Sequence, residues 1–387
     1  MDLYISEEAS MLCRTVDEVA TRERFREATA IADEKATFPW EIWEALVGVG
    51  LPGLEVSGEY GGAGRNTSES CYVLERLATH SIAASTAMFT MVGFGTHLLE
   101  ELSIDHDLRK ALNQIQTGEF RSCLGLTEAS GGADLSQIST RLRKQGSSWL
   151  LNGTKLYTTL AGEATHIVVG ALFGDSSDPW TSRFTICLVP AEYRNIAKSR
   201  ISTQALRCCP TYQVYFDDVE LNDKEVLMPP EGLRVLMAIL NKERLAVGAQ
   251  SCGLAVRAMQ LGIEYAQSRE IAGTLLSNKQ VIIHRLVDLW TKLTAARLLM
   301  RRAAYGVDEK DHSGVLPTMA QQYAANIAHE IADFALQIHG GFGLTTDSEI
   351  QRIWRDTRLH LIGPIPREMA NDYLGRKLKS DSLLDML

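Results

Sequence analysis

The sequence predicts an α+β fold in which helical regions at both ends of the chain flank a central β region. Apolar residues recur at helical spacing over residues 1–120 and again over residues 228–387. Residues 121–227 instead contain short runs rich in β-branched side chains and bounded by turn residues. A chain of 387 residues has room for two or three domains. We therefore expect an N-terminal helical domain, a middle β domain and a C-terminal helical bundle.

The spacing of apolar side chains gives the expected helices in chain order. In the N-terminal region the helical pattern covers residues 12–32, 40–50, 69–79 and 84–101. Glycines such as Gly58 and Gly61 mark the turns between these segments. In the C-terminal region the pattern covers residues near 231–268, 278–305, 316–339 and 366–379.

Three runs in the middle region predict strands. Residues 166–173 and 184–189 are short and β-branched, and Pro190 closes the second run. Residues 213–219 alternate in part between apolar and polar side chains, which is typical of a half-buried strand.

A glycine motif at residues 48–53 matches the pattern G-x-G-x-x-G, which occurs in dinucleotide-binding proteins. That pattern binds a nucleotide when a strand precedes it and a helix follows it. Here a helix is expected before the motif, and Pro52 favours an extended exit. The motif therefore predicts a turn at a helix end.

The charge of the chain argues against a nucleic-acid partner. The net charge is −9, and the most visible basic cluster is Arg297, Arg301 and Arg302. These arginines recur at helical spacing among Leu and Ala, so they predict a solvated or interface face of a helix.

The N-terminal residues and the cysteines suggest the compartment. The first residues have neither a basic segment nor an apolar segment of a signal peptide, and no run reaches the ~18 apolar residues of a membrane span. Seven cysteines are scattered without a C-x-x-C pattern, which favours free thiols and no metal site. We therefore expect a cytoplasmic protein without a membrane partner.

Two motifs in the middle region are the most informative feature of the chain. One is L-T-E-A-S-G-G-A-D at residues 126–134, and the other is N-G-T-K-L-Y-T-T at residues 152–159. Together they resemble the paired flavin-contact signatures of the acyl-CoA dehydrogenase family, in the same order and at a similar separation. The resemblance spans residues 1 to about 379. It implies FAD as cofactor and a fold with an N-terminal helical domain, a middle β-barrel domain and a C-terminal four-helix bundle.

The resemblance also implies roles for single residues. Thr127 would hydrogen-bond the pyrimidine edge of the flavin, Thr159 would lie near its N5 atom, and Tyr157 would pack along the ring. Hydroxyls suit these positions because they donate or accept a hydrogen bond without a charge. Ala133 stands where the family has a serine that shapes the substrate side. The alternative is that these residues only satisfy local backbone groups.

Further matches lie in the C-terminal region. Arg269 and Gln280 resemble family residues that reach the pyrophosphate and adenosine of FAD across a subunit interface, although Ala272 replaces the family's phenylalanine. Gln337, Gly340 and Gly341 match a glycine-rich family element that approaches FAD from the neighbouring subunit. These matches imply a homodimer or a homotetramer. The alternatives are a surface cation for Arg269 and a simple turn for the glycines.

The usual catalytic glutamate of the family is absent. Counted from Arg355 and Asp356, Pro364 stands at the glutamate position and Pro366 at that of a threonine that contacts FAD. Proline offers neither a carboxylate nor an N–H group.

A minority of the family has its base on the first helix of the bundle, in a D-x-E-R pattern that resembles N-K-E-R at residues 241–244. The resemblance implies that Glu243 is the base, with Arg244 beside it at the substrate. Partial burial would raise the pKa of this carboxyl. The alternative is that Glu243 pairs with a Lys or Arg on its own helix.

The resemblance implies an FAD-dependent oxidoreductase that dehydrogenates the α,β-carbons of an acyl thioester, either acyl-CoA or an acyl carrier protein. Glu243 would remove the Cα proton, and flavin N5 would take the Cβ hydride. Electrons would leave through an electron-transferring flavoprotein or, as the alternative, to oxygen. Two alternatives stay open: a flavin-dependent monooxygenase or oxidase on the same fold, and a scaffold protein that retains the fold without FAD.

Overall fold

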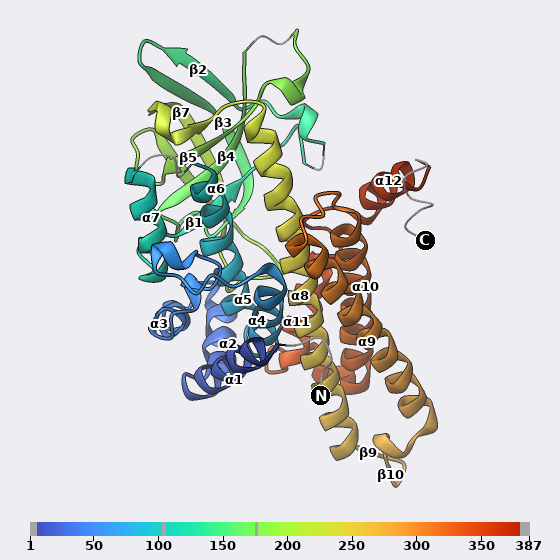
Figure 1. Cartoon of the computed structure of the whole chain (residues 1–387). Helices are drawn as coiled ribbons and strands as arrows, with labels where there is room; N and C mark the ends of the chain where they lie inside the picture. Colours follow the sequence, from blue (N-terminus) through green and yellow to red (C-terminus); the bar gives the residue numbers. More distant parts are fainter. Residues whose placement is uncertain (1–5, 103–105, 133, 175–176, 380–387) are drawn as a thin grey trace.

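The structure is a computed structural model that describes residues 6–102, 106–132, 134–174 and 177–379. The chain forms an N-terminal helical part, a middle β-sheet and a C-terminal set of long helices (Figure 1). The change from helices to strands falls between Gln116 and Ser122, and the change back falls between Leu227 and Glu231. The expected order of α, β and α regions is confirmed.

The N-terminal part consists of short helices. Their bounds are Glu7–Arg22 (α1), Phe25–Lys35 (α2), Trp40–Gly48 (α3), Thr67–His80 (α4), Ile82–Ala87 (α5), the π-helical turn Met88–Gly93 (η3), Phe94–Leu102 (α6) and His106–Gln116 (α7). The expected helical stretch at residues 12–32 is two helices, because Arg24 has a φ of 52° and turns the chain. At residues 48–53, α3 ends at Gly48 and Gly50 has a φ of 73°. The expected helix-end turn is therefore confirmed.

The stretch Ile82–Glu100 is long and apolar enough to cross a membrane by length and composition. The sequence analysis did not expect such a stretch. Its most apolar window is 83% buried inside the protein, so the packing of a core helix accounts for its composition.

The middle part is one eight-stranded sheet with the order β6-β7-β3-β2-β4-β5-β8, and β1 pairs with β4. The strands are Ser122–Gly125 (β1), Arg141–Gln145 (β2), Ser148–Thr159 (β3), His166–Phe173 (β4), Phe184–Pro190 (β5), Ile196–Ile201 (β6), Thr211–Leu221 (β7) and Val226–Leu227 (β8). The strands expected at 166–173, 184–189 and 213–219 are confirmed as β4, β5 and β7. The others were missed because strands such as β2 and β6 are largely polar and exposed.

The C-terminal part contains the longest helices. Its elements are Glu231–Ser268 (α8), the hairpin Glu270–Ile271 (β9) and Thr274–Leu275 (β10), Gln280–Asp308 (α9), Val315–His339 (α10), Glu349–His360 (α11) and Arg367–Leu378 (α12). The four helices expected here are confirmed, whereas α11 was not expected because most of its residues are polar.

Glycines let α8 pack closely at the centre of the molecule. A Cβ at Gly253 would lie 2.7 Å from the Cβ of Ala78 on α4, and a Cβ at Gly248 would lie 2.9 Å from Cε of Met300 on α9. Helix α8 thereby connects the N-terminal helices with the bundle. In Figure 1 it extends from the sheet to the far end of the molecule.

The basic cluster on α9 partly faces the protein itself. The Arg297 guanidinium lies 2.6 Å from the Glu75 carboxylate of α4, and Arg301 lies over the ring of Tyr72. The expectation of a solvated or interface face is therefore wrong for these two arginines, because the packing of α9 against α4 gives them partners within the chain.

Candidate active site

The two flavin-signature segments lie against each other in space. The first follows β1, and the second is the end of β3. The backbone N–H of Leu156 donates to the carbonyl of Thr127 over 2.8 Å. The buried ammonium of Lys155 lies 2.6 Å from the carboxylate of Glu128 and also donates to the carbonyl of Leu126. The two motifs therefore form one unit.

Glu128 is the centre of this unit. Its carboxylate is buried and accepts hydrogen bonds from the backbone N–H and the hydroxyl of both Ser139 and Thr140. Burial raises the pKa of Glu128, but the ammonium of Lys155 and the two hydroxyls outweigh burial and hold the pKa below its usual value. A charged Glu128 thus fixes the loop that contains Thr127.

Strand β3 presents Tyr157 to the surface. The pairing of β3 with β7 is irregular between Lys155 and Thr158, and Tyr157 within this bulge has a φ of 55°. The side chain of Tyr157 is 63% exposed. A large aromatic side chain held open at a strained backbone position is consistent with a ligand-contact surface.

The hydroxyls expected to contact the flavin are available. In the part of the chain that the structure describes, the side-chain hydroxyls of Thr127, Tyr157 and Thr159 have no hydrogen-bond partner. Thr127 and Thr159 are half-buried. Free hydroxyls beside an exposed aromatic ring fit the polar edge and the flat face of a flavin.

The other predicted FAD residues lie together at the far end of the bundle. Arg269 follows the end of α8, and Gln280 begins α9. Gln337 is near the end of α10, which the turn Gly340–Leu344 (η8) follows. Ala266, Leu276 and Ile338 form one small core that holds these segments side by side.

This distal group is remote from the flavin-signature segments. Helix α8 has 38 residues, so it spans roughly 57 Å at a rise of about 1.5 Å per residue. Figure 1 shows the β9–β10 hairpin at the opposite end of α8 from the sheet. The structure therefore does not bring Arg269, Gln280, Gln337, Gly340 and Gly341 to Thr127 within one chain.

The glycine-rich turn at the distal end is open. A Cβ at Gly340 or Gly341 would meet no atom within 4 Å, and Gly340 has a φ of 60°. Packing within the chain therefore does not require a glycine at position 341. Its small size leaves room for the backbone to approach another body closely.

Glu243, the residue expected to be the base, lies on α8. Its side chain is half-buried, and no residue in the described ranges forms a hydrogen bond or ion pair with it. Burial raises the pKa of Glu243 to about 7, and the nearby charge of Arg244 only partly opposes this effect. The alternative of a helix-surface ion pair is therefore not what the structure has.

Arg244 is held beside Glu243 by Asn241. The guanidinium donates to Oδ1 of the buried Asn241 over 2.6 Å, and burial lowers the pKa of Arg244. Ala133, the other residue expected at the substrate, lies outside the described residues. Pro364 and Pro366 lie in the loop between α11 and α12, while Glu368 is exposed on α12.

Asp356 is a second carboxyl with an unusual environment, and its role was not recognised in the sequence. It is buried and accepts the backbone N–H of Leu206 over 2.6 Å. Burial raises its pKa to about 7. Its neighbour Arg355 forms an ion pair with Asp33. These contacts fix α11 to the loop after β6 and to α2.

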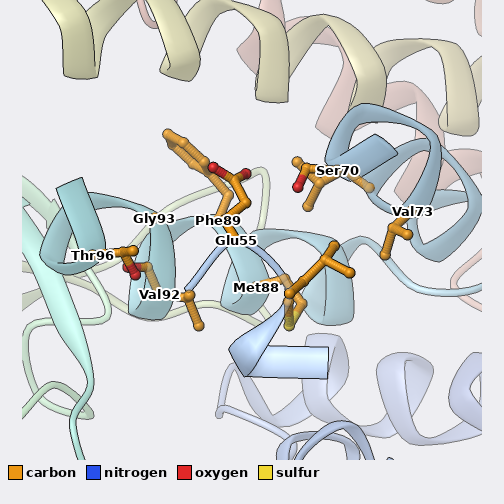
Figure 2. Close-up of a pocket in the computed structure, with 10 residues that line it drawn as sticks. Glu55, Ser70, Val73, Met88, Phe89, Val92, Gly93 and Thr96 are labelled. Atoms are coloured by element: carbon orange, nitrogen blue, oxygen red, sulfur yellow. The ribbon is translucent and has the colours of Figure 1, made fainter. Parts of the chain in front are cut away.

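A small cavity that was not predicted from the sequence lies within the N-terminal part. Its lining residues come from the loop after α3 and from α4, η3 and α6, and they include Leu54, Glu55, Ser70, Phe89 and Thr96 (Figure 2). No sequence signal identifies it, since its residues are spread over about forty positions in three elements.

Comparisons with known proteins agree with this geometry. Family profiles described as the N-terminal, middle and C-terminal domains of acyl-CoA dehydrogenase match residues 6–119, 123–219 and 230–378. The chain belongs to the acyl-CoA dehydrogenase family. It is 30% identical to the 3-(aryl)acrylate reductase of Clostridium sporogenes over 86% of this chain and 89% of that protein.

Two further proteins are similar to this chain over nearly their whole length. The caffeyl-CoA reductase-Etf complex subunit CarC of Acetobacterium woodii is 29% identical over 93% of this chain and 95% of that protein. The structure of butyryl-CoA dehydrogenase from Megasphaera elsdenii superposes with a TM-score of 0.91 at 23% identity, over 98% of this chain and all of that chain.

Membership of the acyl-CoA dehydrogenase family makes this protein an FAD-dependent oxidoreductase that acts on a CH–CH bond. The residues of β3 and of the loop after β1 fit the cofactor, because they combine free hydroxyls with an exposed aromatic ring.

Proposed function

We propose that this protein catalyses the α,β-dehydrogenation of an acyl thioester and that Glu243 is its base. The observation that supports this most strongly is the state of Glu243: a half-buried carboxyl that pairs with none of the described residues and has a pKa of about 7. A base with a pKa near the working pH is both deprotonated in a large fraction of molecules and strong enough to accept a carbon-bound proton.

The other site residues have supporting roles in this proposal. Thr127, Tyr157 and Thr159 bind the flavin ring, and Arg244 contacts the substrate beside Glu243. FAD, when bound, supplies the acceptor for the Cβ hydride. The substrate is an acyl group on CoA or on a carrier protein.

Two further features of the surface support assembly with other proteins. Helix α9 exposes Val281, Val287 and Trp290, and a hollow of about 220 Å³ beside Trp290 is lined in part by Met259 and Leu293. We infer a homodimer or homotetramer in which Arg269, Gln280, Gln337, Gly340 and Gly341 contact FAD of a neighbouring copy, because they lie too far from their own β3.

The name of the Acetobacterium relative includes Etf, which supports an electron-transferring flavoprotein as redox partner.

The location of the protein belongs to the same proposal. All seven cysteines are free thiols, and five of them are buried. This usage supports a reducing compartment, the cytoplasm.

Exchange of the Cα proton tests the role of Glu243 directly. The FAD-loaded protein is incubated without oxygen in D₂O with saturated acyl-CoA thioesters, and deuterium at Cα is measured by mass spectrometry. We expect incorporation by the natural protein and a rate lower by about 100-fold or more in Glu243→Gln. Glu368→Gln, at an exposed position of α12, is the control. An unchanged exchange rate in Glu243→Gln would show that another group is the base.

The loop around Pro364 favours one other function on this fold, a flavin-dependent monooxygenase or oxidase. Such an enzyme needs no base at Cα. It would keep its activity in Glu243→Gln and would consume oxygen, with NAD(P)H as reductant for a monooxygenase or with its own substrate as reductant for an oxidase. The proposed dehydrogenase would instead lose its activity.

A further inference from the structure

The small cavity beside α8 has an apolar wall with a polar end. The wall is formed by Leu54, Val73, Leu74, Met88, Phe89 and Val92. The polar end consists of Glu55, from the loop after α3, and Ser70, from α4 (Figure 2). The cavity measures about 30 Å³, which is room for roughly one or two water-sized groups.

The polar end is incompletely paired within the described residues. The hydroxyl of Ser70 is buried, at 4% exposure, and forms no hydrogen bond of normal geometry with them. Oε2 of Glu55 accepts a hydrogen bond from Lys242 over 3.0 Å, and the Ser70 hydroxyl lies near enough to this carboxylate to favour its charged form. A buried hydroxyl without a full hydrogen bond is costly, so this end of the cavity would bind a ligand group that completes it.

The charge of Glu55 is already balanced. Lys242 lies 3.0 Å from Oε2 of Glu55 and 3.1 Å from Nδ1 of His97, and His97 lies 3.5 Å from the same carboxylate oxygen. Burial raises the pKa of Glu55, but Lys242, His97 and the nearby Ser70 hydroxyl together outweigh burial and hold it below its usual value. A second cation would be repelled by Lys242. A neutral group that both donates and accepts, such as a hydroxyl, fits Glu55 and Ser70 together.

Two contacts link the elements that line the cavity to the residues proposed for the reaction. Lys242 precedes Glu243 on α8, so the ion pair with Glu55 and the base belong to the same turn of the helix. On the other side, the N–H of Gly95 donates to the hydroxyl of Ser122 on β1, which leads into the loop of Thr127. The elements that line the cavity thus contact both the base helix and the flavin-contact strand.

We propose that this cavity receives the far end of the acyl chain and selects a hydroxyl group there, with Glu55 accepting its hydrogen bond and Ser70 donating to it. The preferred substrates are therefore hydroxyacyl thioesters, and alkyl chains of the same size are poorer. This inference rests on the proposed dehydrogenation of an acyl thioester.

Matched pairs of thioesters test the selection. We would compare 5-hydroxypentanoyl-CoA with hexanoyl-CoA and 6-hydroxyhexanoyl-CoA with heptanoyl-CoA, because a hydroxyl and a methyl group have similar size. The measurement is kcat/KM with an artificial electron acceptor. For the better-fitting pair we expect kcat/KM for the hydroxyacyl thioester to exceed kcat/KM for its alkyl partner by about tenfold or more. This is the usual effect of a hydrogen bond to a charged group.

Three variants separate the polar contacts from effects on folding. Ser70→Ala should lower the preference for the hydroxyl by about tenfold. The double variant Glu55→Leu with Lys242→Met removes both charges together and should abolish the preference. The control is Thr86→Val, which removes another buried hydroxyl without a partner, on α5 outside the cavity. Bound FAD and the unfolding midpoint of each variant show whether it is folded.

The outcomes distinguish the two proposals. If alkyl thioesters react as well as hydroxyacyl thioesters in the natural protein, the selection is refuted while the dehydrogenase stands. If Thr86→Val changes the preference as much as Ser70→Ala does, the cavity is not the cause, and the selection is equally refuted. If no thioester of either kind reacts, both proposals fall.

Discussion

Glu243 and Arg244 illustrate at the residue scale how neighbours on a helix can have opposite environments. Arg244 has the amide of Asn241 as a partner, whereas Glu243 has none in the ranges that the structure describes and is partly removed from water. The position of Glu243 could be predicted from the sequence because the N-K-E-R pattern is local. The ion pair of Lys242 with Glu55 could not, since it joins residues 187 positions apart.

The pH dependence of activity should follow the ionisation of Glu243. The base must be deprotonated, so kcat/KM should rise with pH and reach half of its maximum near pH 7, the pKa of this carboxyl. The pH–rate profile measures this. Asp356 titrates in the same range, so Asp356→Asn is the control and should leave the midpoint in place if it folds. A profile that is flat from pH 5 to 9 would contradict the assignment.

Glu243→Gln should also change stability in a pH-dependent manner. The pKa is about 7 in the folded state against an ordinary 4.5, so the folded protein resists ionisation of this group. Below about pH 4.5 the carboxyl is protonated in the folded and the unfolded state, so its ionisation does not change the free energy of unfolding. Above about pH 7 its ionisation costs stability, so Glu243→Gln should be more stable than the natural protein by about 1–3 kcal/mol. Urea unfolding at pH 5 and pH 8 measures the difference, and an equal difference at both pH values would contradict this assignment.

At the scale of elements, β3 and the loop after β1 depend on contacts that a single sequence shows only in part. The runs of β4 and β5 were predictable because both faces of these strands are buried and their residues are continuously apolar. Strand β3 mixes buried, half-buried and exposed positions and has two irregularities in its pairing, so its pattern has no regular period.

Lys155→Met should strongly destabilise the contact between β3 and the loop after β1. It leaves the carboxylate of Glu128 buried without its cation, which typically costs about 3–5 kcal/mol. Because Glu128 holds the loop of Thr127, bound FAD should fall as well. Calorimetry and the ratio of flavin to protein absorbance measure both effects. Lys144→Met, at an exposed ion pair with Asp223 on the same sheet, should change either quantity little.

Gly153→Ala should disturb the bulged strand directly. Gly153 has a φ of 156°, and a Cβ there would lie 2.7 Å from the Cβ of Thr140. We expect a loss of about 2–4 kcal/mol, from strain together with overpacking. Gly146→Ala is the matched control, since Gly146 has a φ of 62° but open space around it, and it should cost only about 1 kcal/mol. Equal losses in urea unfolding would show that packing at Gly153 contributes nothing.

At the scale of the whole molecule, α8 separates two groups of predicted cofactor residues. The resemblance to the family predicted both groups, and it predicted that the distal group serves a neighbouring subunit. Their separation along a helix of 38 residues supports that prediction, because one chain cannot bring them together. The sequence could not give the three-dimensional position of either group, since this depends on how α8, α9 and α10 pack.

Trp290→Lys should therefore impair assembly and FAD binding together. Trp290 is 64% exposed on α9, and a charge there opposes burial in an interface. We expect a smaller particle in analytical ultracentrifugation and less bound FAD. Met11→Lys, at an exposed apolar residue of α1, should change neither. If the natural protein is a monomer with full FAD, the distal group has another role.

The most direct test of the central claim is an anaerobic titration of the FAD-loaded protein with saturated acyl thioesters, followed by the absorbance of oxidised flavin. Glu243→Gln is titrated in parallel. The account predicts that at least one thioester bleaches the flavin of the natural protein and that the variant stays yellow on the same time scale. No bleaching by any thioester, or equal bleaching of the variant, would contradict it.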